Sequence, residues 1–239
     1  MLNKCKEEDF YQIKSAALDR LSPENVSGFF WGGLVLSLVM TIISFANVGN
    51  EVSTFMAIMV SISLLLFFIQ LFFTLLFTFK GVAYRLQRLL SAILSFIGFK
   101  ISIDTYQAFF GVSETKYSPD FIKNAGIFLF LGGIILLVIS TFRAIKRVKQ
   151  GELREDGKGL YDFKNSKGFA SLPIIYGVTM LGGAAGRSFS DMSTDVTALI
   201  FLFFAVILQY SVALALPEFF LLTYCKFRFE SFKVKRYGG

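Results

Sequence analysis

The sequence contains no histidine, only two cysteines and one tryptophan, and few charged residues for its length. Of its 239 residues, 17% are charged, against roughly a quarter in an average soluble protein. Without histidine, the chain cannot supply an imidazole base or a histidine-ligated metal site. Two cysteines are too few for a disulfide scaffold, and so apolar a chain is not intrinsically disordered.

The sequence is rich in apolar residues. Hydrophobic residues make up 54% of the chain, phenylalanine alone occurs 30 times, and the mean hydropathy is +0.62. This composition predicts an all-α polytopic integral membrane protein. A helix needs about 20 residues to cross roughly 30 Å of hydrocarbon. Six stretches qualify as spans and form one membrane domain over residues 25–225: 28–48, 52–79, 89–112, 125–142, 168–186 and 196–216.

The third stretch is ambiguous, because Lys100 and Asp104 lie in its middle. The distribution of positive charge favours a crossing. If all six stretches cross and the N-terminus is cytosolic, every lysine and arginine outside the spans is cytosolic except Lys116, Lys123 and Arg187. This is the asymmetry that the positive-inside rule describes. We therefore expect six helices with both termini cytosolic, and Cys5 and Cys225 as reduced thiols in the cytosol.

The two ends of the chain are predicted to lie outside the membrane. Residues 1–24 carry mixed charge and no long apolar run, so they are not a secretory signal. Their apolar residues recur at the spacing of one helix face, which predicts a short amphipathic helix against the cytosolic surface or a partner. These residues are Phe10, Ile13, Ala17 and Leu21. Residues 22–24 have the form of a helix start, and residues 226–239 form a basic cytosolic tail.

The third span carries the best candidate for a polar site within the membrane. Lys100, Asp104 and Gln107 share a narrow stripe of one helix face with Gly111. A lone charge in a bilayer is costly, so Lys100 and Asp104 are expected to pair within one turn. Two interpretations follow. The pair is either a self-neutralised element that helps the helix insert, or part of an ion, proton or substrate pathway.

Two further polar residues are candidates within or near the spans. Gln70 shares a face with Ser63 and Thr74 in the second span, and it could form a hydrogen bond with Gln107 or Asp104. Glu218 directly follows Pro217 near the end of the sixth span. We expect this proline to bend the chain into a separate interfacial helix, with the Glu218 carboxylate reaching water or a cation.

Small residues four apart predict two sites of close helix packing. Gly28 and Gly32 form such a pair in the first span, and Gly182 and Gly186 form another in the glycine-rich fifth span. The alternative for the fifth span is a broken helix that lines a cavity.

The loop after the fourth span is the densest basic patch of the chain. It begins with Arg143, Lys146, Arg147 and Lys149. In the cytosol these cations can contact anionic lipid, and the alternative is that they dock a cytosolic partner. Either interpretation explains the formal charge of +7 without a nucleic-acid partner.

No catalytic motif is present. The sequence has no Gly-x-Ser-x-Gly, phosphate-binding loop or dinucleotide fingerprint. Asp191 and Asp195 lie four apart, as in enzymes that bind a metal and a diphosphate, but the further acidic residues that such enzymes need are missing. We therefore predict no catalytic residues, no metal and no cofactor.

These observations favour a non-enzymatic integral membrane protein of a bacterial plasma membrane. Its expected role is that of a membrane subunit or interaction module in a transport system or a toxin-neutralising system, with the lipid bilayer and another subunit or a second copy as partners. One alternative is a self-contained small channel or secondary transporter that uses the face of Lys100, Asp104 and Gln107. A second alternative is a lipid-modifying membrane enzyme that uses Asp191 and Asp195.

Overall fold

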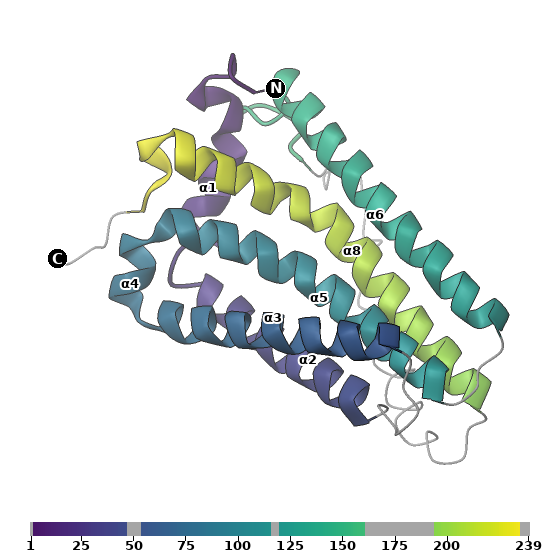
Figure 1. Ribbon diagram of the computed structural model, residues 1–239. Coiled ribbons are helices and arrows are strands. Elements are labelled where there is room, and N and C mark those ends of the chain that lie inside the picture. Colours follow the sequence, from purple (N-terminus) through teal and green to yellow (C-terminus); the bar gives the residue numbers. More distant parts are fainter. Residues whose placement is uncertain (1, 47–53, 116–119, 161–193, 235–239) are drawn as a thin grey trace, which may run out of the picture.

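The computed structural model describes residues 2–46, 54–115, 120–160 and 194–234 (Figure 1). Every element in these ranges is a helix, which confirms the predicted all-α class. The α-helices are α1 (Tyr11–Leu18), α2 (Val26–Ala46), α3 (Thr54–Thr78), α4 (Lys80–Arg85), α5 (Gln87–Thr115), α6 (Asp120–Lys149) and α8 (Thr194–Arg228), and two short 3-10 helices are η1 (Glu7–Phe10) and η2 (Glu230–Phe232).

Five of these helices are long and apolar enough to cross a membrane. The candidate spans are Val26–Ala46, Met56–Thr78, Gln87–Ser113, Asp120–Lys149 and Val196–Arg228. Each contains or overlaps one of the predicted spans, and the ambiguous stretch 89–112 forms part of the continuous helix α5. The predicted span 168–186 lies outside the described residues, so the count of six stays a prediction.

Helix α5 occupies the centre of the bundle. It contacts α2, α3, α6 and α8, and its interface with α8 is the most extensive of these. In the apolar window of α5, 67% of the residues are buried, against 11% in α6. Because neighbouring helices enclose α5, its polar residues face protein rather than lipid, which is where a membrane protein can hold them at least cost.

Helices α6 and α8 run side by side in the same direction. The Gln209 amide donates a hydrogen bond to the Phe130 carbonyl at 3.1 Å, and the Ser140 hydroxyl donates to the Ala213 carbonyl at 2.6 Å. Residue numbers therefore increase in the same direction along both helices at this interface, so the two helices are parallel, as Figure 1 also shows. Two neighbouring helices with the same direction require the intervening chain to return from the end of α6 to the start of α8.

Helices α2 and α5 also run in the same direction. Near the start of α2, Gly33 packs against Ile97 and Ile101, whereas further along Gly111 of α5 packs against Ser44. Helix α3 runs the opposite way, since Met56 at its start also contacts Gly111. One end of the bundle is thus the place where α2 and α5 begin and α3, α6 and α8 finish (Figure 1).

We call this end the basic end, because it collects almost all of the positive charge. Every described lysine and arginine except Lys100 and Lys123 lies there, in the helix ends or in the segments that fold over them. The N-terminal segment is fixed to this end, because Arg228 donates hydrogen bonds to the carbonyls of Leu2 and Asn3 at 2.6 and 2.7 Å.

The predicted N-terminal amphipathic helix is present but shorter than residues 1–24. It consists of η1 and α1 and ends at Leu18, and α2 begins at Val26 after a turn. Phe10, Ile13 and Ala17 are buried as the periodicity predicts. They pack against protein, since the Phe10 ring lies 5.9 Å from the ring of Tyr224 near the end of α8.

The bend expected at Pro217 does not separate a second helix from α8. Instead α8 continues through Pro217 to Arg228. A proline lacks the N–H that would bind the carbonyl four residues earlier. That carbonyl belongs to Ala213, and it accepts its hydrogen bond from Ser140 of α6 instead. The neighbouring helix therefore repairs the break, as in many membrane helices.

Candidate functional site

The buried charge pair of α5 is the most polar point of the helix bundle. Lys100 and Asp104 lie one turn apart, with 2.6 Å between Nζ and Oδ2, and their side chains are 1% and 4% exposed. Ser37 of α2 completes the group, because its hydroxyl donates to Asp104 Oδ2 at 2.6 Å and accepts from Lys100 Nζ at 3.1 Å. Pairing and hydrogen bonding together offset the cost of burying the two charges.

The close approach of α2 to α5 depends on Gly33. A Cβ atom at this position would lie 2.8 Å from Ile101 Cδ1 and 3.2 Å from Ile97 Cγ2. Ser37 lies one turn further along the same face of α2, so the contact at Gly33 positions its hydroxyl over the charge pair. The sequence argument placed close packing at Gly28 and Gly32, but a Cβ atom at either would meet nothing within 4 Å. No described residue packs closely against Gly28 or Gly32, so close packing at this pair stays a prediction, and Gly182 and Gly186 lie outside the described residues.

Three polar side chains of α3 are buried without a side-chain hydrogen bond to any described residue. Gln70, Ser63 and Thr74 share the buried face of the helix, as their spacing indicates. Among the described residues, neither amide atom of Gln70 has a partner, so the expected bond to Gln107 or Asp104 does not form. The position of Gln70 along the bundle explains this: Gln70 lies near Gly33 of α2. Asp104, in turn, already bonds with Lys100 and Ser37.

A small cavity of about 100 Å³ lies between α3 and α5, next to the charge pair. Its polar lining consists of Ser63, Lys100, Asp104 and Gln107, and the remaining walls are apolar. The Gln107 Nε2 atom has no hydrogen-bond partner within the described residues. This space could hold a few water molecules, whose share of liquid volume is about 30 Å³ each, or a small polar group.

Glu218 lies apart from this polar group, at the basic end of the bundle. Its carboxylate forms an ion pair with Arg20 of the N-terminal segment. The expected contact with a cation is therefore made, but by a residue of the chain itself. This ion pair joins the N-terminal segment to α8 and does not extend the buried polar group of α5.

The basic patch divides into two kinds of residue. Arg143, Lys146 and Lys149 are exposed at the end of α6 and have no ion-pair partner within the described ranges. Arg147 instead turns inward: it lies 3.0 Å from the Glu152 carboxylate and donates to the Gly159 and Leu160 carbonyls. Arg147 therefore shapes the segment after α6, whereas the other three remain available to a partner or to lipid.

Sequence reasoning missed Ser37, although a signal was present. Ser37, Thr41 and Ser44 recur at steps of four and three along the first span, and all three are buried. This spacing marks a polar helix face in the same way as the stripe of α5 does.

The two free cysteines, Cys5 and Cys225, are buried.

The described part of the chain is thus an α-helical bundle with five helices able to cross a membrane and a neutralised charge pair in its interior. No protein-family model, curated protein or solved structure matches this chain. Within the described ranges, no group of three or more Cys, Asp or Glu residues could hold a metal ion. Asp191 lies outside the described residues, and so does the side chain of Asp195.

Proposed function

We propose that this chain is a non-enzymatic integral membrane protein that serves as the membrane subunit or interaction module of a larger protein complex. One observation carries the proposal: the charge inside the bundle is neutralised internally, whereas free charge is exposed at the basic end. Lys100 and Asp104 pair with each other. Arg143 and Lys146 project from α6 without ion-pair partners among the described residues. Such an exposed patch steers and orients an oppositely charged partner.

The proposed topology places the basic end in the cytosol of a bacterial cell. The positive-inside rule supports this side, because Lys123 is the only described lysine or arginine, apart from the buried Lys100, that does not lie at the basic end. Both residue 2 and residue 234 would then be cytosolic. The shared direction of α6 and α8 supports a sixth crossing between Leu160 and Thr194, because the chain has to return between them.

Two surfaces suit two kinds of partner. The cations at the end of α6 suit an acidic surface of a cytosolic protein. Among the described residues, helix α6 also leaves most of its apolar length uncovered, with 11% of its window buried, and we place a second membrane subunit or a second copy of the chain on that face. A transport system and a toxin-neutralising system both use membrane subunits of this kind.

The test is extraction into native lipid particles followed by mass measurement of what co-purifies. We expect a stoichiometric partner. Reversing charge with Arg143→Glu and Lys146→Glu should release a cytosolic partner, whereas Lys123→Glu, at the opposite end of the same helix, should retain it. A chain that is recovered alone, or an assembly that survives the charge reversal unchanged, contradicts docking at the basic end.

A small channel or secondary transporter is the second candidate, and the cavity beside Lys100, Asp104 and Gln107 favours it. Flux through purified protein in liposomes tests this function. Replacing Lys100 and Asp104 together by leucine should abolish flux if the cavity lies on a pathway, and should leave complex assembly intact if the pair is structural. The lipid-modifying alternative stays a prediction, which Asp191→Asn combined with Asp195→Asn tests.

A further inference from the structure

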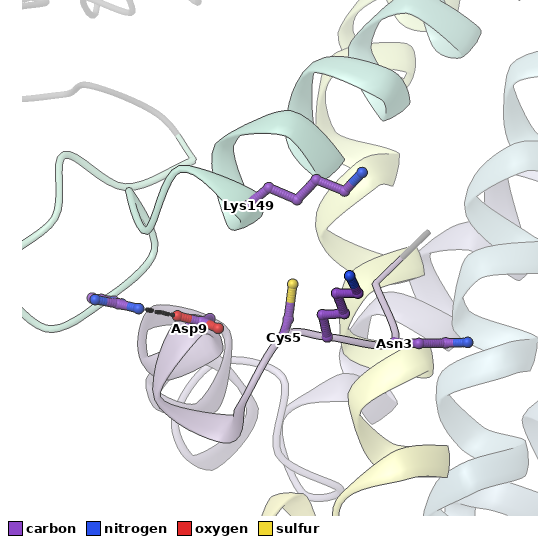
Figure 2. A pocket seen from close by; sticks show the side chains of 6 residues that line it. Asn3, Cys5, Asp9 and Lys149 are labelled. Atoms are coloured by element: carbon purple, nitrogen blue, oxygen red, sulfur yellow. Dashed lines mark hydrogen bonds and ion pairs between the residues drawn. The ribbon is translucent and has the colours of Figure 1, made fainter.

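A cavity of about 580 Å³ lies at the basic end, outside the polar group of α5. Two parts of the chain that are distant in sequence line it: the N-terminal segment, and the end of α6 together with the segment that follows it. Figure 2 shows Lys149 extending from α6 on one side, with Asn3 and Cys5 on the N-terminal segment opposite. The lining residues are Asn3, Lys4, Cys5, Asp9, Lys149 and Arg154.

The walls of this cavity are held by hydrogen bonds that leave its lysines free. Arg228 fixes the backbone of residues 2 and 3 through two bonds to carbonyl oxygens. On the opposite wall, the Gln12 amide donates to the carbonyls of Arg154 and Gly157 at 3.2 and 3.0 Å. The backbone of both walls is therefore held without a ligand, which lowers the part of the entropic cost of binding that comes from ordering the walls.

The cavity carries excess positive charge. Asp9 is the single carboxylate among the described residues that line it, and Arg154 already occupies Oδ1 through Nε at 2.8 Å and Nη2 at 2.7 Å. Burial alone would raise the pKa of Asp9, but hydrogen bonds from Arg154 and from the Lys6 backbone outweigh it and lower that pKa. Asp9 thus stays ionised and offsets Arg154. Lys4 and Lys149 have no ion-pair partner in the described part of the chain.

We propose that this cavity binds a phosphate group carried by a larger molecule. Lys4 and Lys149 bring two ammonium groups without ion-pair partners to the lining, and the Asn3 amide and the Arg154 guanidinium line the same cavity, so the site offers cationic donors to a phosphate. The volume lies within the roughly 300–1,000 Å³ typical of small-molecule sites and leaves room beyond the phosphate itself. This inference does not rest on the proposed subunit role.

The phosphate can come from the headgroup of an anionic lipid or from a soluble phosphate ester. Lys149 is the last residue of a candidate membrane-spanning helix, which puts the cavity at one end of the bundle, the part of a membrane protein that a lipid headgroup can reach. In both cases the recognised chemistry is the phosphate ester, and the two sources are separated by experiment.

The experiment uses the full chain and two probes. Native mass spectrometry of protein in nanodiscs compares phosphatidic acid with phosphatidylcholine, and calorimetry in neutral detergent measures glycerol 3-phosphate. Retained phosphatidic acid identifies a lipid headgroup, and binding of glycerol 3-phosphate identifies a soluble ester. Lys4→Gln combined with Lys149→Gln should weaken binding of whichever probe binds by about tenfold, since charge-assisted contacts to the phosphate are lost.

A matched control makes the result specific. Lys146→Gln combined with Lys158→Gln removes the same charge from exposed lysines of the basic end that do not line the cavity. This control should bind the probe as the parent does, even if it loses a protein partner at Lys146, so the two proposals fail separately. Equal loss in both double variants, or no binding of either probe to the folded parent, overturns the phosphate site.

Discussion

The Ser140 hydroxyl of α6 donates a 2.6 Å hydrogen bond to the Ala213 carbonyl of α8, the acceptor that Pro217 leaves without its usual helical partner. An unpaired carbonyl has no water to bind within hydrocarbon. This bond therefore satisfies an acceptor at the α6–α8 interface that would otherwise be buried without a donor. Together with the Gln209–Phe130 bond, it shows that the two helices run in the same direction.

The first prediction concerns this bond. Ser140→Ala should lower the free energy of unfolding in mixed micelles by about 1 kcal/mol, the size of an interhelical hydrogen bond in a membrane protein. The loss has a specific cause: Pro217 has no N–H to donate, so Ser140→Ala leaves the Ala213 carbonyl without a donor.

A double-mutant cycle provides the control. In the Pro217→Ala background, the restored N–H can bind the Ala213 carbonyl, so Ser140→Ala should cost clearly less there than in the parent. Equal costs in the two backgrounds would show that Ser140 does not compensate for the proline.

The second prediction compares two adjacent glycines of α2. Gly33→Leu should destabilise the bundle by about 1–3 kcal/mol, because even a Cβ atom there would lie 2.8 Å from Ile101 Cδ1. Gly32→Leu should have little effect, since a Cβ atom at Gly32 meets nothing within 4 Å. Unfolding of both variants in mixed micelles checks this, and equal destabilisation would contradict the packing of α2 on α5.

Contacts within one helix could be predicted from the sequence, whereas contacts between helices could not. The pairing of Lys100 with Asp104 is local, because residues four apart meet on any helix, and the spacing was sufficient. The spacing of Ser37, Thr41 and Ser44 marks a polar face of α2. It does not predict that Ser37 bonds with Lys100 and Asp104, because this contact depends on how α2 is rotated against α5. The same rotation separates Gly33, at the contact, from Gly32, which faces away. The continuity of α8 at Pro217 likewise depends on a donor from another helix.

The third prediction concerns the charge pair. Lys100→Leu alone leaves the Asp104 carboxylate buried without its cation and should cost about 3–5 kcal/mol of stability, or prevent membrane insertion. Lys100→Leu combined with Asp104→Leu removes both charges, so much of the loss should be recovered. The measurements are the yield of inserted protein and its unfolding in mixed micelles. A double variant that is less stable than the single one would show that the pair stabilises the bundle beyond its own neutralisation.

The fourth prediction follows from the lowered pKa of Asp9, which lies outside the membrane-spanning helices. A carboxyl group whose pKa is lower in the folded state stabilises that state above its unfolded pKa of about 3.9, and this contribution disappears as pH falls through the lower folded value. The contacts of Asp9 with Arg154 and the Lys6 backbone should therefore hold the N-terminal segment at neutral pH and release it in acid. Hydrogen exchange of residues 6–12, measured at decreasing pH, checks this expectation.

Variants of both partners separate Asp9 from its neighbour Glu7, whose pKa the hydrogen bond from Lys14 also lowers. Asp9→Asn and Arg154→Gln should each raise exchange of the segment at neutral pH and flatten its acid dependence, because the same ion pair is absent in both. Lys14→Gln should remove only the contribution of Glu7 and leave the remaining acid transition in place. If Asp9→Asn keeps the full acid dependence of the parent, the titrating group is not Asp9, and the Asp9–Arg154 pair does not hold the wall of the basic-end cavity.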